Sequence, residues 1–575
     1  MQNQRKAFWR RVVLSILSAV VTVATCGLAP WCQAGGGPEN VFLLVNSASD
    51  DSLTIANHYI DLRKIPAGNV FYLKYTGNLA AIKGDKFREL ILTPAVKEIA
   101  RRGLSGQIDY LVYSCDFPWR VDFKNPAAQA NNSAKPVRAS LTAASYLGAF
   151  VMGNRPEMFS LSSNFYFSLP QSGLTMSRGF RSQYRWSVGG KRAGTKGITY
   201  LLSAMLGVTN GRGNSVEEIL YYLRRSSEAD GTLPKGTVYF VQSGDLRSKT
   251  RHDRFPAAAR ELQLAGVQAE IMEGRFPLGK LNIIGATTGK AQLKVAQSGS
   301  RLLPGAFCDN LTSTGGVFRI PQKPPGQTCV SEFLRLGAAG ACGTIFEPRA
   351  VWQKFPLPQI HVHYARGCSL AEAFYQSVSG PYQQILVGDP LCMPWAISPQ
   401  VGVGDLTDGA TIRDVVTIVP ATHVVKPQGV ASYELFVDGK RLQRCKPAGQ
   451  FSLNTKALAD GYHELRVVAV ENTPIETQGR WIGQVIVKNG RDAVQLSLNE
   501  STLAKDMKQI TLKVVSTTKD SVIVLHNGRE LGRVSEGTGR VQVRKNLLGS
   551  GPVVLVAQAE GSPGLRSRPL RIELP

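Results

Sequence analysis

Polar and nucleophilic side chains follow several of the strands that the sequence predicts, at the points where those strands end. They are Asp116, Asp245, Thr287, Thr288, Cys308, Asp309 and Glu347. In an open α/β sheet, ligands bind beyond the carboxyl ends of the strands. The sequence therefore predicts an acidic crevice that carries a thiol. For each residue taken singly, the alternative is capping of the helix that follows, a role that Asp and Thr often fill.

Cys308 is the candidate catalytic residue of this set, and the other six are candidate binding residues. A cysteine nucleophile needs a base or a cation beside it to populate the thiolate. Thr287 and Thr288 cannot supply that base, because a hydroxyl does not take a proton from a thiol near neutral pH. We therefore expect Cys308 to be a partly buried structural thiol. The chain also lacks the G-x-S-x-G and H-E-x-x-H motifs of serine hydrolases and zincins.

Two further motifs resemble cofactor or metal sites. The stretch 285–291 (GATTGKA) follows a strand, as a phosphate-binding loop does, but it is one residue short and lacks the Ser or Thr that would hold Mg²⁺. His361 and His363 would project from one face of a strand, with Cys368 nearby. A structural zinc ion takes four ligands and no fourth is evident, so we favour a surface pair. We expect neither a metal nor a cofactor.

The region from about residue 38 to 396 alternates strand and helix signals. Ser215-x-x-Glu218 and Ser369-x-x-Glu372 are capping boxes, each followed by apolar residues at helical spacing. This alternation predicts an α/β domain with a mostly parallel, doubly wound sheet. Residues 118–200 break the pattern and are predicted to form a long surface insertion. The predicted strands include NVFLLVN (40–46), VFYLKY (70–75), IDYLVYS (108–114), TVYFVQS (237–243), LNIIGAT (281–287) and GACGTIF (340–346).

Helix signals disappear after Trp395, and a repeat takes their place. The hairpin turns Asp438-Gly439 and Asn527-Gly528 lie 89 residues apart, and LRVVAVE (465–471) aligns with VLVAQAE (554–560) at the same offset. A spacing kept across two strand pairs indicates a duplicated β-domain. We predict two all-β immunoglobulin-like sandwiches, at 400–490 and 491–575.

Residues 1–34 have the pattern of a secretory signal peptide. A basic head is followed by an apolar run and by small residues before a glycine tract. The alternative is a retained transmembrane anchor, because the run approaches the length that spans a bilayer. We favour cleavage, which leaves an exported chain with no transmembrane segment, located in the periplasm, at the cell surface or outside the cell.

The chain is strongly basic. Its net charge is +25, and removing the four basic residues of the signal lowers the charge to +21. Such an excess favours anionic partners, such as an envelope polysaccharide, and export argues against nucleic acid. The alternative is a solvated basic surface with no single partner. Seven cysteines remain after the signal, so at least one thiol is free or intermolecular.

Four stretches carry a resemblance to a known family. They are NVFLLVNSASDDSLTIANHYIDLRKIPAGNV, PGAFCDNLTSTGG, LRLGAAGACGTIFEP and KFPLPQIHVHYARGCSLAEAFYQSVSGPYQQILVGDP. Over residues 40–396 the chain resembles an uncharacterised family of exported bacterial proteins, found in species that carry exosortase. Exosortase is the membrane enzyme that processes C-terminally tagged exported proteins. The resemblance implies a cellular context and no activity.

A second resemblance is to the gingipain-like cysteine peptidases, which have a caspase-like fold. Those chains have a His-Gly after one central strand, a Cys after the next and a closing Gly-Asp-Pro. Here 388–390 match the closing Gly-Asp-Pro, and Cys308 matches the nucleophile. The stretch 285–289 (GATTG) stands where those peptidases have their His-Gly, and it contains no histidine. The resemblance implies a degenerate peptidase fold used for binding, unless His361 or His363 reaches Cys308.

Two functions remain. The first is a non-catalytic binding or assembly protein of the cell envelope, with anionic polysaccharide or other exported proteins as partners and the tandem sandwiches as spacer or adhesive arms. The second is a cysteine peptidase or transpeptidase that acts on exported proteins through Cys308. We favour the first, because the catalytic His is missing where the chemistry requires it.

Overall fold

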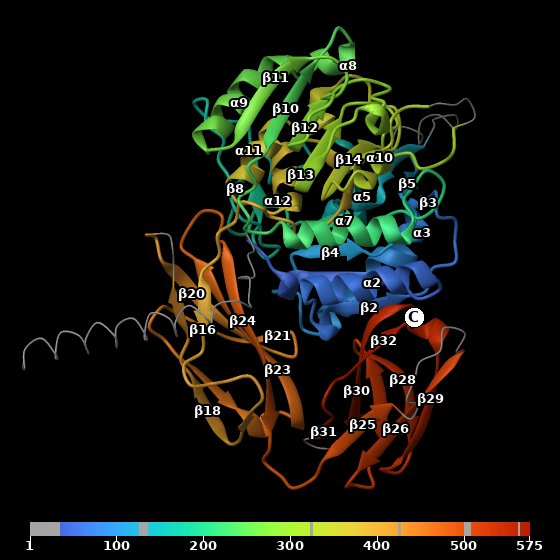
Figure 1. The fold of residues 1–575 in the computed structure, drawn as a ribbon, viewed down its shortest axis with the longest axis vertical. Coiled ribbons are helices and arrows are strands. Elements are labelled where there is room, and N and C mark those ends of the chain that lie inside the picture. The colour runs from blue at the N-terminus through green and yellow to red at the C-terminus, as the bar shows by residue number, and fades with distance from the viewer. Residues whose placement is uncertain (1–34, 126–135, 322–325, 424–426, 499–507, 562–563) are drawn as a thin grey trace, which may run out of the picture. The chain divides into compact units, whose positions relative to one another are not determined.

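A ten-stranded sheet forms the centre of the first 390 residues in this computed structural model (Figure 1). The structure describes residues 35–125, 136–321, 326–423, 427–498, 508–561 and 564–575, so the predicted signal peptide lies outside the described residues. Across the sheet the strands are β11 (Gln268–Glu273), β10 (Thr237–Gln242), β12 (Ile283–Thr288), β13 (Leu302–Asn310), β14 (Gly340–Thr344), β15 (Gln384–Gly388), β9 (Leu202–Met205), β4 (Tyr110–Tyr113), β1 (Val41–Asn46) and β2 (Val70–Leu73).

The sheet consists of two halves that run in opposite directions. Every neighbouring pair is parallel except β14 and β15, where Gly340 pairs with Gly388 and Thr344 with Gln384. The chain is therefore mixed α/β with a mostly parallel sheet, as the sequence predicts. The carboxyl ends of β10, β12, β13 and β14 lie at one edge, and those of β1, β4 and β9 lie at the opposite edge.

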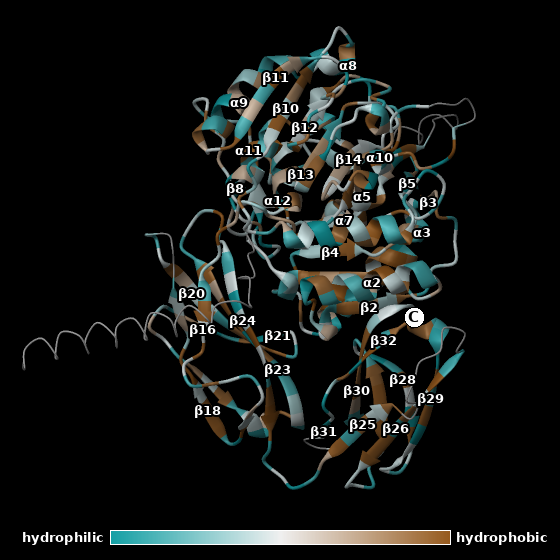
Figure 2. Cartoon of the chain, in the orientation of Figure 1, coloured by the Kyte–Doolittle hydropathy of each residue, from teal (hydrophilic) through white to brown (hydrophobic). Residues whose placement is uncertain are grey.

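Helices cover the sheet, and apolar residues run along its strands (Figure 2). All six residues of β1 are buried, as expected of a strand that is covered on both faces. Both predicted capping boxes are present, at the starts of α7 and α12. The longer helices are α2 (Asp50–Arg63), α4 (Thr93–Arg101), α5 (Leu141–Tyr146), α7 (Val216–Glu228), α9 (Phe255–Leu264), α10 (Val330–Arg335), α11 (Gln359–Ala365) and α12 (Leu370–Ser377).

The described residues of the predicted insertion at 118–200 do not all lie at the surface. Trp119, Tyr146 and Trp186 are buried in the same core as the central strands. The segment is rich in polar residues, so the burial of these widely spaced aromatic residues is not evident from its composition. Its smaller elements are β5 (Arg120–Phe123), β6 (Val137–Ser140), α6 (Gly148–Met152), β7 (Trp186–Ser187) and β8 (Lys191–Arg192). β3 (Ile82–Lys83) and α3 (Gly84–Phe87) precede it, and α8 (Leu246–Lys249) follows it.

The chain after residue 400 consists of β-strands in two sandwich-like regions. The first contains β16 (Gln400–Gly402), β17 (Ala410–Ile412), β18 (Val415–Ile418), β19 (Ala421–His423), β20 (Val430–Val437), β21 (Lys440–Cys445), β22 (Phe451–Asn454), β23 (Asp460–Glu471) and β24 (Gln478–Val487). The second contains β25 (Val494–Leu498), β26 (Gln509–Ser516), β27 (Val522–His526), β28 (Arg529–Val534), β29 (Gly539–Arg544), β30 (Gly551–Ala559), β31 (Leu565–Arg566) and β32 (Leu570–Leu574).

The repeated turns join equivalent hairpins in the two regions. β20 pairs with β21 and β23, and β27 pairs with β28 and β30. The two residues of each turn have positive φ, as a two-residue type I′ hairpin requires: 50° and 83° at Asp438 and Gly439, 47° and 76° at Asn527 and Gly528. The regions have separate hydrophobic cores, although β31 extends the ladder to two residues of β23.

Both repeated turns lie against the α/β part. The amide of Gln107 donates to the carbonyl oxygen of Gly439 at 2.6 Å. The amide of Asn527 donates to the hydroxyl of Tyr72 at 3.0 Å. Each of the two β regions therefore contacts the α/β part through its repeated turn.

A buried ion cluster joins α2 to the segment that follows β15. Asp389 is fully buried and accepts hydrogen bonds from Nε of Arg63 at 2.8 Å and from the hydroxyl of Tyr59 at 3.0 Å. The Arg63 guanidinium also forms an ion pair with Asp230, just after α7. One cation thus joins three segments that are far apart in the sequence.

Replacing Asp389 by Asn is expected to destabilise the protein by about 3–5 kcal/mol, because the variant leaves a buried guanidinium with one counter-ion fewer. Denaturant unfolding of the full chain measures the loss. The control is Glu530→Gln, which removes an exposed partner of Arg533 and should leave the unfolding midpoint unchanged. Equal midpoints for both variants would contradict the proposed role of the cluster.

Candidate functional site

The predicted crevice residues do not all lie at one edge of the sheet. Asp245 follows β10, Asp309 lies in β13 and Glu347 follows β14, so these residues share an edge. Asp116 follows β4, which belongs to the half that runs the other way. The prediction that Asp116 clusters with the others is therefore wrong. Its physical reason is the antiparallel pairing of β14 with β15, which no local pattern in the sequence indicates.

Two of the predicted acids, Asp245 and Glu347, make local contacts at their turns, whereas Asp116 contacts residues far away in the sequence. Asp116 accepts hydrogen bonds from the hydroxyls of Ser49, at 2.5 Å, and Thr209, at 2.6 Å. Asp245 is the N-cap of α8 and accepts from the backbone N–H of Arg247 at 3.0 Å. Glu347 accepts from the backbone N–H of residue 349 at 2.7 Å. Asp245 therefore has the alternative role expected from the sequence, which is to cap the helix that follows its strand.

Thr288 and Asp309 lie around a buried arginine that sequence reasoning missed. Arg251 forms an ion pair with Asp309, and both side chains are 1% exposed. The same guanidinium donates to the carbonyl oxygens of Thr288 and Pro356, both at 2.9 Å. The counter-ion of Asp309 is thus a buried side chain of the protein itself, Arg251. Arg251 lies in the polar stretch KTRHDR, and nothing in that stretch indicates burial.

Cys308 is enclosed within β13. Its side chain is fully buried, and burial together with the charge of Asp309 raises the pKa of its thiol well above the ordinary value. In the part of the chain that the structure describes, no hydrogen bond joins an imidazole to its sulfur. A protonated, enclosed thiol is a poor nucleophile.

The two histidines lie on a helix, so the prediction that they share one face of a strand is wrong. His361 and His363 belong to α11, where residues two apart point in nearly opposite directions. Nε2 of His361 lies 3.0 Å from the Thr287 hydroxyl, and Nδ1 of His363 lies 2.9 Å from the Ser177 hydroxyl. Burial lowers the pKa of His361 to about 3 and leaves its ring neutral. Within the described ranges, no group of three or more His, Cys, Asp or Glu side chains is arranged to hold a metal ion.

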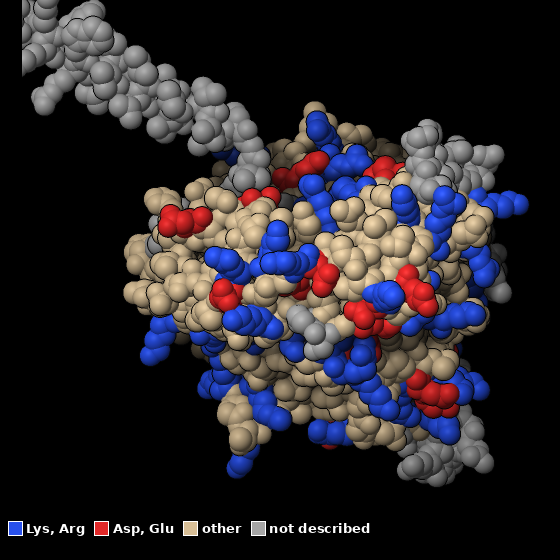
Figure 3. Space-filling model, turned by 90° about the horizontal axis from the view of Figure 1, so that it is seen from below, with Lys and Arg blue, Asp and Glu red and all other residues tan. Residues whose placement is uncertain are grey.

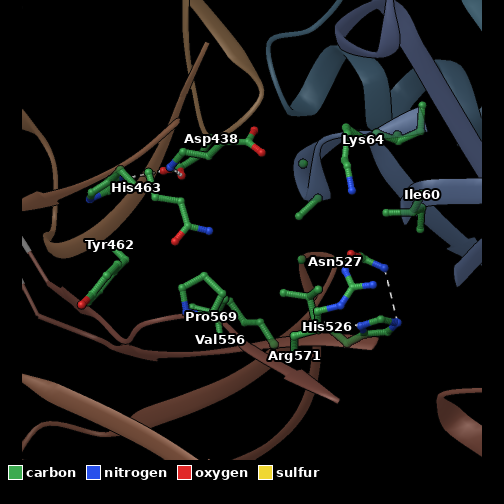
Figure 4. A pocket seen from close by; sticks show the side chains of 18 of the residues that line it. Ile60, Lys64, Asp438, Tyr462, His463, His526, Asn527, Val556, Pro569 and Arg571 are labelled. Carbon is green, nitrogen blue, oxygen red and sulfur yellow. Dashed lines mark hydrogen bonds and ion pairs between the residues drawn. The ribbon is translucent and has the colours of Figure 1, made fainter. Parts of the chain in front are cut away.

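A cavity of about 410 Å³ lies elsewhere, between α2 and strands of both β regions (Figure 4). Figure 4 shows Lys64, at the end of α2, extending toward Asn527 in the second repeated turn and toward Arg571 in β32. The apolar part of the wall includes Ile60, Ile65, Leu525, Val554, Val556 and Pro569. The polar part includes Asp61, Lys64, Asp438, Tyr462, His463, His526, Arg566 and Arg571. No sequence motif indicates this cavity, because its residues come from three separate parts of the chain.

Two clusters of charged groups line the cavity, in addition to the ion pair of Arg466 with Glu464. Asp61 accepts from Nη1 of Arg571 at 2.6 Å and from Nζ of Lys64 at 3.2 Å. The hydrogen bond from Arg571 lowers the pKa of Asp61 against the effect of partial burial, and Lys64 adds to the shift. Asp61 therefore stays ionised and holds the guanidinium of Arg571 and the ammonium group of Lys64 at the cavity.

The second cluster surrounds Asp438, in the first repeated turn. Burial opposes ionisation of this carboxyl, but the hydrogen bond with His463 and the charge of Arg566 lower its pKa. Nδ1 of His463 lies 2.7 Å from Asp438, and Arg566 forms an ion pair with the same carboxylate. By contrast, burial lowers the pKa of His526 to about 4, so that ring is neutral.

The cavity has the composition of a site for a small polar ligand. Its size falls within the range of ordinary ligand pockets, and it combines an apolar wall with a few convergent polar groups. Four cationic side chains line it, from Lys64, Arg466, Arg566 and Arg571, beside the three acids Asp61, Asp438 and Glu464. A carboxylate or another anionic group on the ligand fits this set.

No protein-family model and no curated protein matches the chain. Fibronectin(III)-like modules of CbhA from Clostridium thermocellum are 14% identical over 30% of this chain and 93% of theirs, with a TM-score of 0.14. The human OSCAR ligand-binding domain is 15% identical over 31% of this chain and 98% of its own, with a TM-score of 0.14. A β-glucuronidase of Parabacteroides merdae is 17% identical over 31% of this chain and 25% of its own, with a TM-score of 0.13.

Alkylation of the native protein with iodoacetamide is expected to modify Cys445 and to leave Cys308 untouched up to about pH 9. Of the seven cysteines in the described ranges, six are buried and Cys445 is partly exposed. Mass spectrometry of the digested protein identifies the labelled thiol, and labelling in denaturant is the control. Labelling of Cys308 near neutral pH, together with an activity that Cys308→Ala abolishes, would restore the peptidase hypothesis.

Proposed function

We propose that this chain is an exported cell-envelope protein that binds an anionic polysaccharide, without catalysis, in the cavity between α2 and the two β regions. The observation that carries the proposal is the set of four cationic side chains, Lys64, Arg466, Arg566 and Arg571, around one cavity with a partly apolar wall. Sugar rings present apolar faces and hydroxyl groups, and acidic sugars add a carboxylate. Such a ligand matches both parts of the wall.

The charge of the whole chain supports an anionic partner. The face in Figure 3 carries many Lys and Arg side chains and fewer Asp and Glu side chains. A surface of this kind attracts polyanions before contact, and the attraction weakens as salt screens it. We infer that the basic surface concentrates the polymer and that the cavity binds one of its acidic units.

Export is part of the proposal. The basic head, apolar run and small residues of 1–34 support a cleaved signal peptide. Among the residues that the structure describes, no helix is long and apolar enough to cross a bilayer. The resemblance of residues 40–396 to exported proteins of exosortase-bearing species supports a role in such a surface system.

We further infer that the α/β part is a degenerate caspase-like, gingipain-like domain and that the β regions are immunoglobulin-like. Support for the first comes from the order β11-β10-β12-β13-β14 with antiparallel β15, and from the closing residues 388–390. Support for the second comes from the repeated hairpins and the separate cores. The burial of Cys308 favours binding over peptidase or transpeptidase chemistry.

The test is titration calorimetry of the mature protein with a polyuronic acid oligosaccharide and with a neutral glucan of equal length. We expect the acidic oligosaccharide to bind more tightly and its affinity to fall as salt is added. Arg571→Ala should weaken binding about fivefold, which corresponds to the loss of one partly exposed charged contact of about 1 kcal/mol.

The matched control is Arg533→Ala, in the same β region. Arg533 is also about half exposed and paired with acids, but it does not line the cavity. Neither variant should change the melting temperature much, because exposed ion pairs contribute little to stability. Equal loss of affinity in both variants, or no preference for the acidic oligosaccharide, would contradict the proposal.

A further inference from the structure

Glu372 is a buried carboxylate with an unusual environment. It lies in the first turn of α12 and is fully buried. One oxygen accepts from the backbone N–H of Phe180 and the other from that of Ser369, both at 2.9 Å. Within the described ranges, no Lys, Arg or His side chain forms an ion pair with it. A buried carboxylate that lacks a cation is costly.

Burial has the expected effect on this carboxyl group. It raises the pKa of Glu372 to about 7, although the hydrogen bonds from Ser369 and Phe180 act in the opposite direction. The charged neighbour is Arg181, which forms ion pairs with Asp109 and Glu476. The other titratable groups near Glu372 are Tyr110, Tyr166 and Cys368, and burial holds each of them neutral. The site is therefore short of positive charge.

Gly35 lies directly against this carboxylate. A Cβ atom at Gly35 would lie 1.9 Å from Oε1 of Glu372, so only glycine fits there. Its backbone N–H donates to the carbonyl oxygen of Ile475 at 3.1 Å, and its carbonyl oxygen accepts from Gln478 at 3.2 Å. Gly35 is thus buried and held by strand β24 and by the loop before it, with its Cα beside the carboxylate.

Gly35 is also the first residue after the predicted signal peptide, which ends at Ala34. We propose that cleavage at this bond creates an α-amino group on Gly35 that forms a buried ion pair with Glu372 in the mature protein. A signal peptidase hydrolyses the Ala34–Gly35 peptide bond with one water, which leaves a carboxylate on Ala34 and an amino group on Gly35. That amino group takes up a proton near neutral pH.

The ion pair couples maturation to stability. Before cleavage, the nitrogen of Gly35 is a neutral amide that supplies no charge. After cleavage, the ammonium group has three donors, which suffice for Ile475 and for Glu372 together. Since Glu372 belongs to α12 and Ile475 lies between β23 and β24, the new N-terminus joins the α/β part to the first β region. This inference does not depend on the ligand of the cavity.

The experiment compares two forms of the full mature chain. One begins at Gly35 and the other retains Ala34, which moves the amino group away without altering Glu372. The form that begins at Gly35 should melt roughly 3–5 °C higher. Acetylation of its N-terminus should remove the difference, and so should Glu372→Gln, which keeps the size of the side chain and removes its charge.

The matched control is Glu261→Gln. Glu261 is also buried, but it accepts hydrogen bonds from Thr175 and Arg366, away from Gly35. This variant should lower the melting temperatures of both forms equally and preserve their difference. Mass spectrometry of the exported protein should give Gly35 as the first residue. A different first residue, or a stability difference that survives acetylation or Glu372→Gln, would overturn the proposal, whatever the outcome of the saccharide titration.

Discussion

The guanidinium of Arg63 contacts Asp389 and Asp230 in the interior of the protein, and the positions of α2, the end of α7 and the turn after β15 depend on this contact. Each carboxylate alone would be too costly to bury, and so would the arginine. The cluster forms only when the three segments are correctly placed. β15 is the strand that joins the two halves of the sheet, so the cluster also fixes the seam where the strand direction reverses.

The position of α2 in turn determines the cavity. Its buried face packs on the sheet, and its other face contacts the second β region, where Asn57 donates to the carbonyl oxygen of Leu548 at 2.7 Å. The first β region is held by another buried cluster, in which Glu39 accepts from Arg466 at 2.9 Å and from Arg480 at 3.2 Å. The cavity is therefore bounded by elements that are each fixed by buried polar contacts, which favours a preformed binding site.

The local parts of this fold could be predicted from sequence, because local interactions determine them. The capping boxes at Ser215 and Ser369 and the repeated turns at Asp438 and Asn527 depend on residues three or fewer positions apart. The reversal of strand direction, the buried pair of Arg251 with Asp309 and the cavity depend on residues far apart in the chain. The helix that holds His361 could not be distinguished from a strand by its sequence, because its seven residues show no clear periodicity.

The distribution of acids explains how a chain with a net charge of +25 folds around carboxylates. Asp389, Asp309 and Glu39 are each buried against arginine, so these acids neutralise cations in the interior rather than at the surface. The surface is left basic, as the proposed anionic partner requires. Glu372 differs from these three acids, since no side chain of the described residues forms an ion pair with it. An N-terminal amino group at Gly35 would complete the pattern with a charge that no side chain carries.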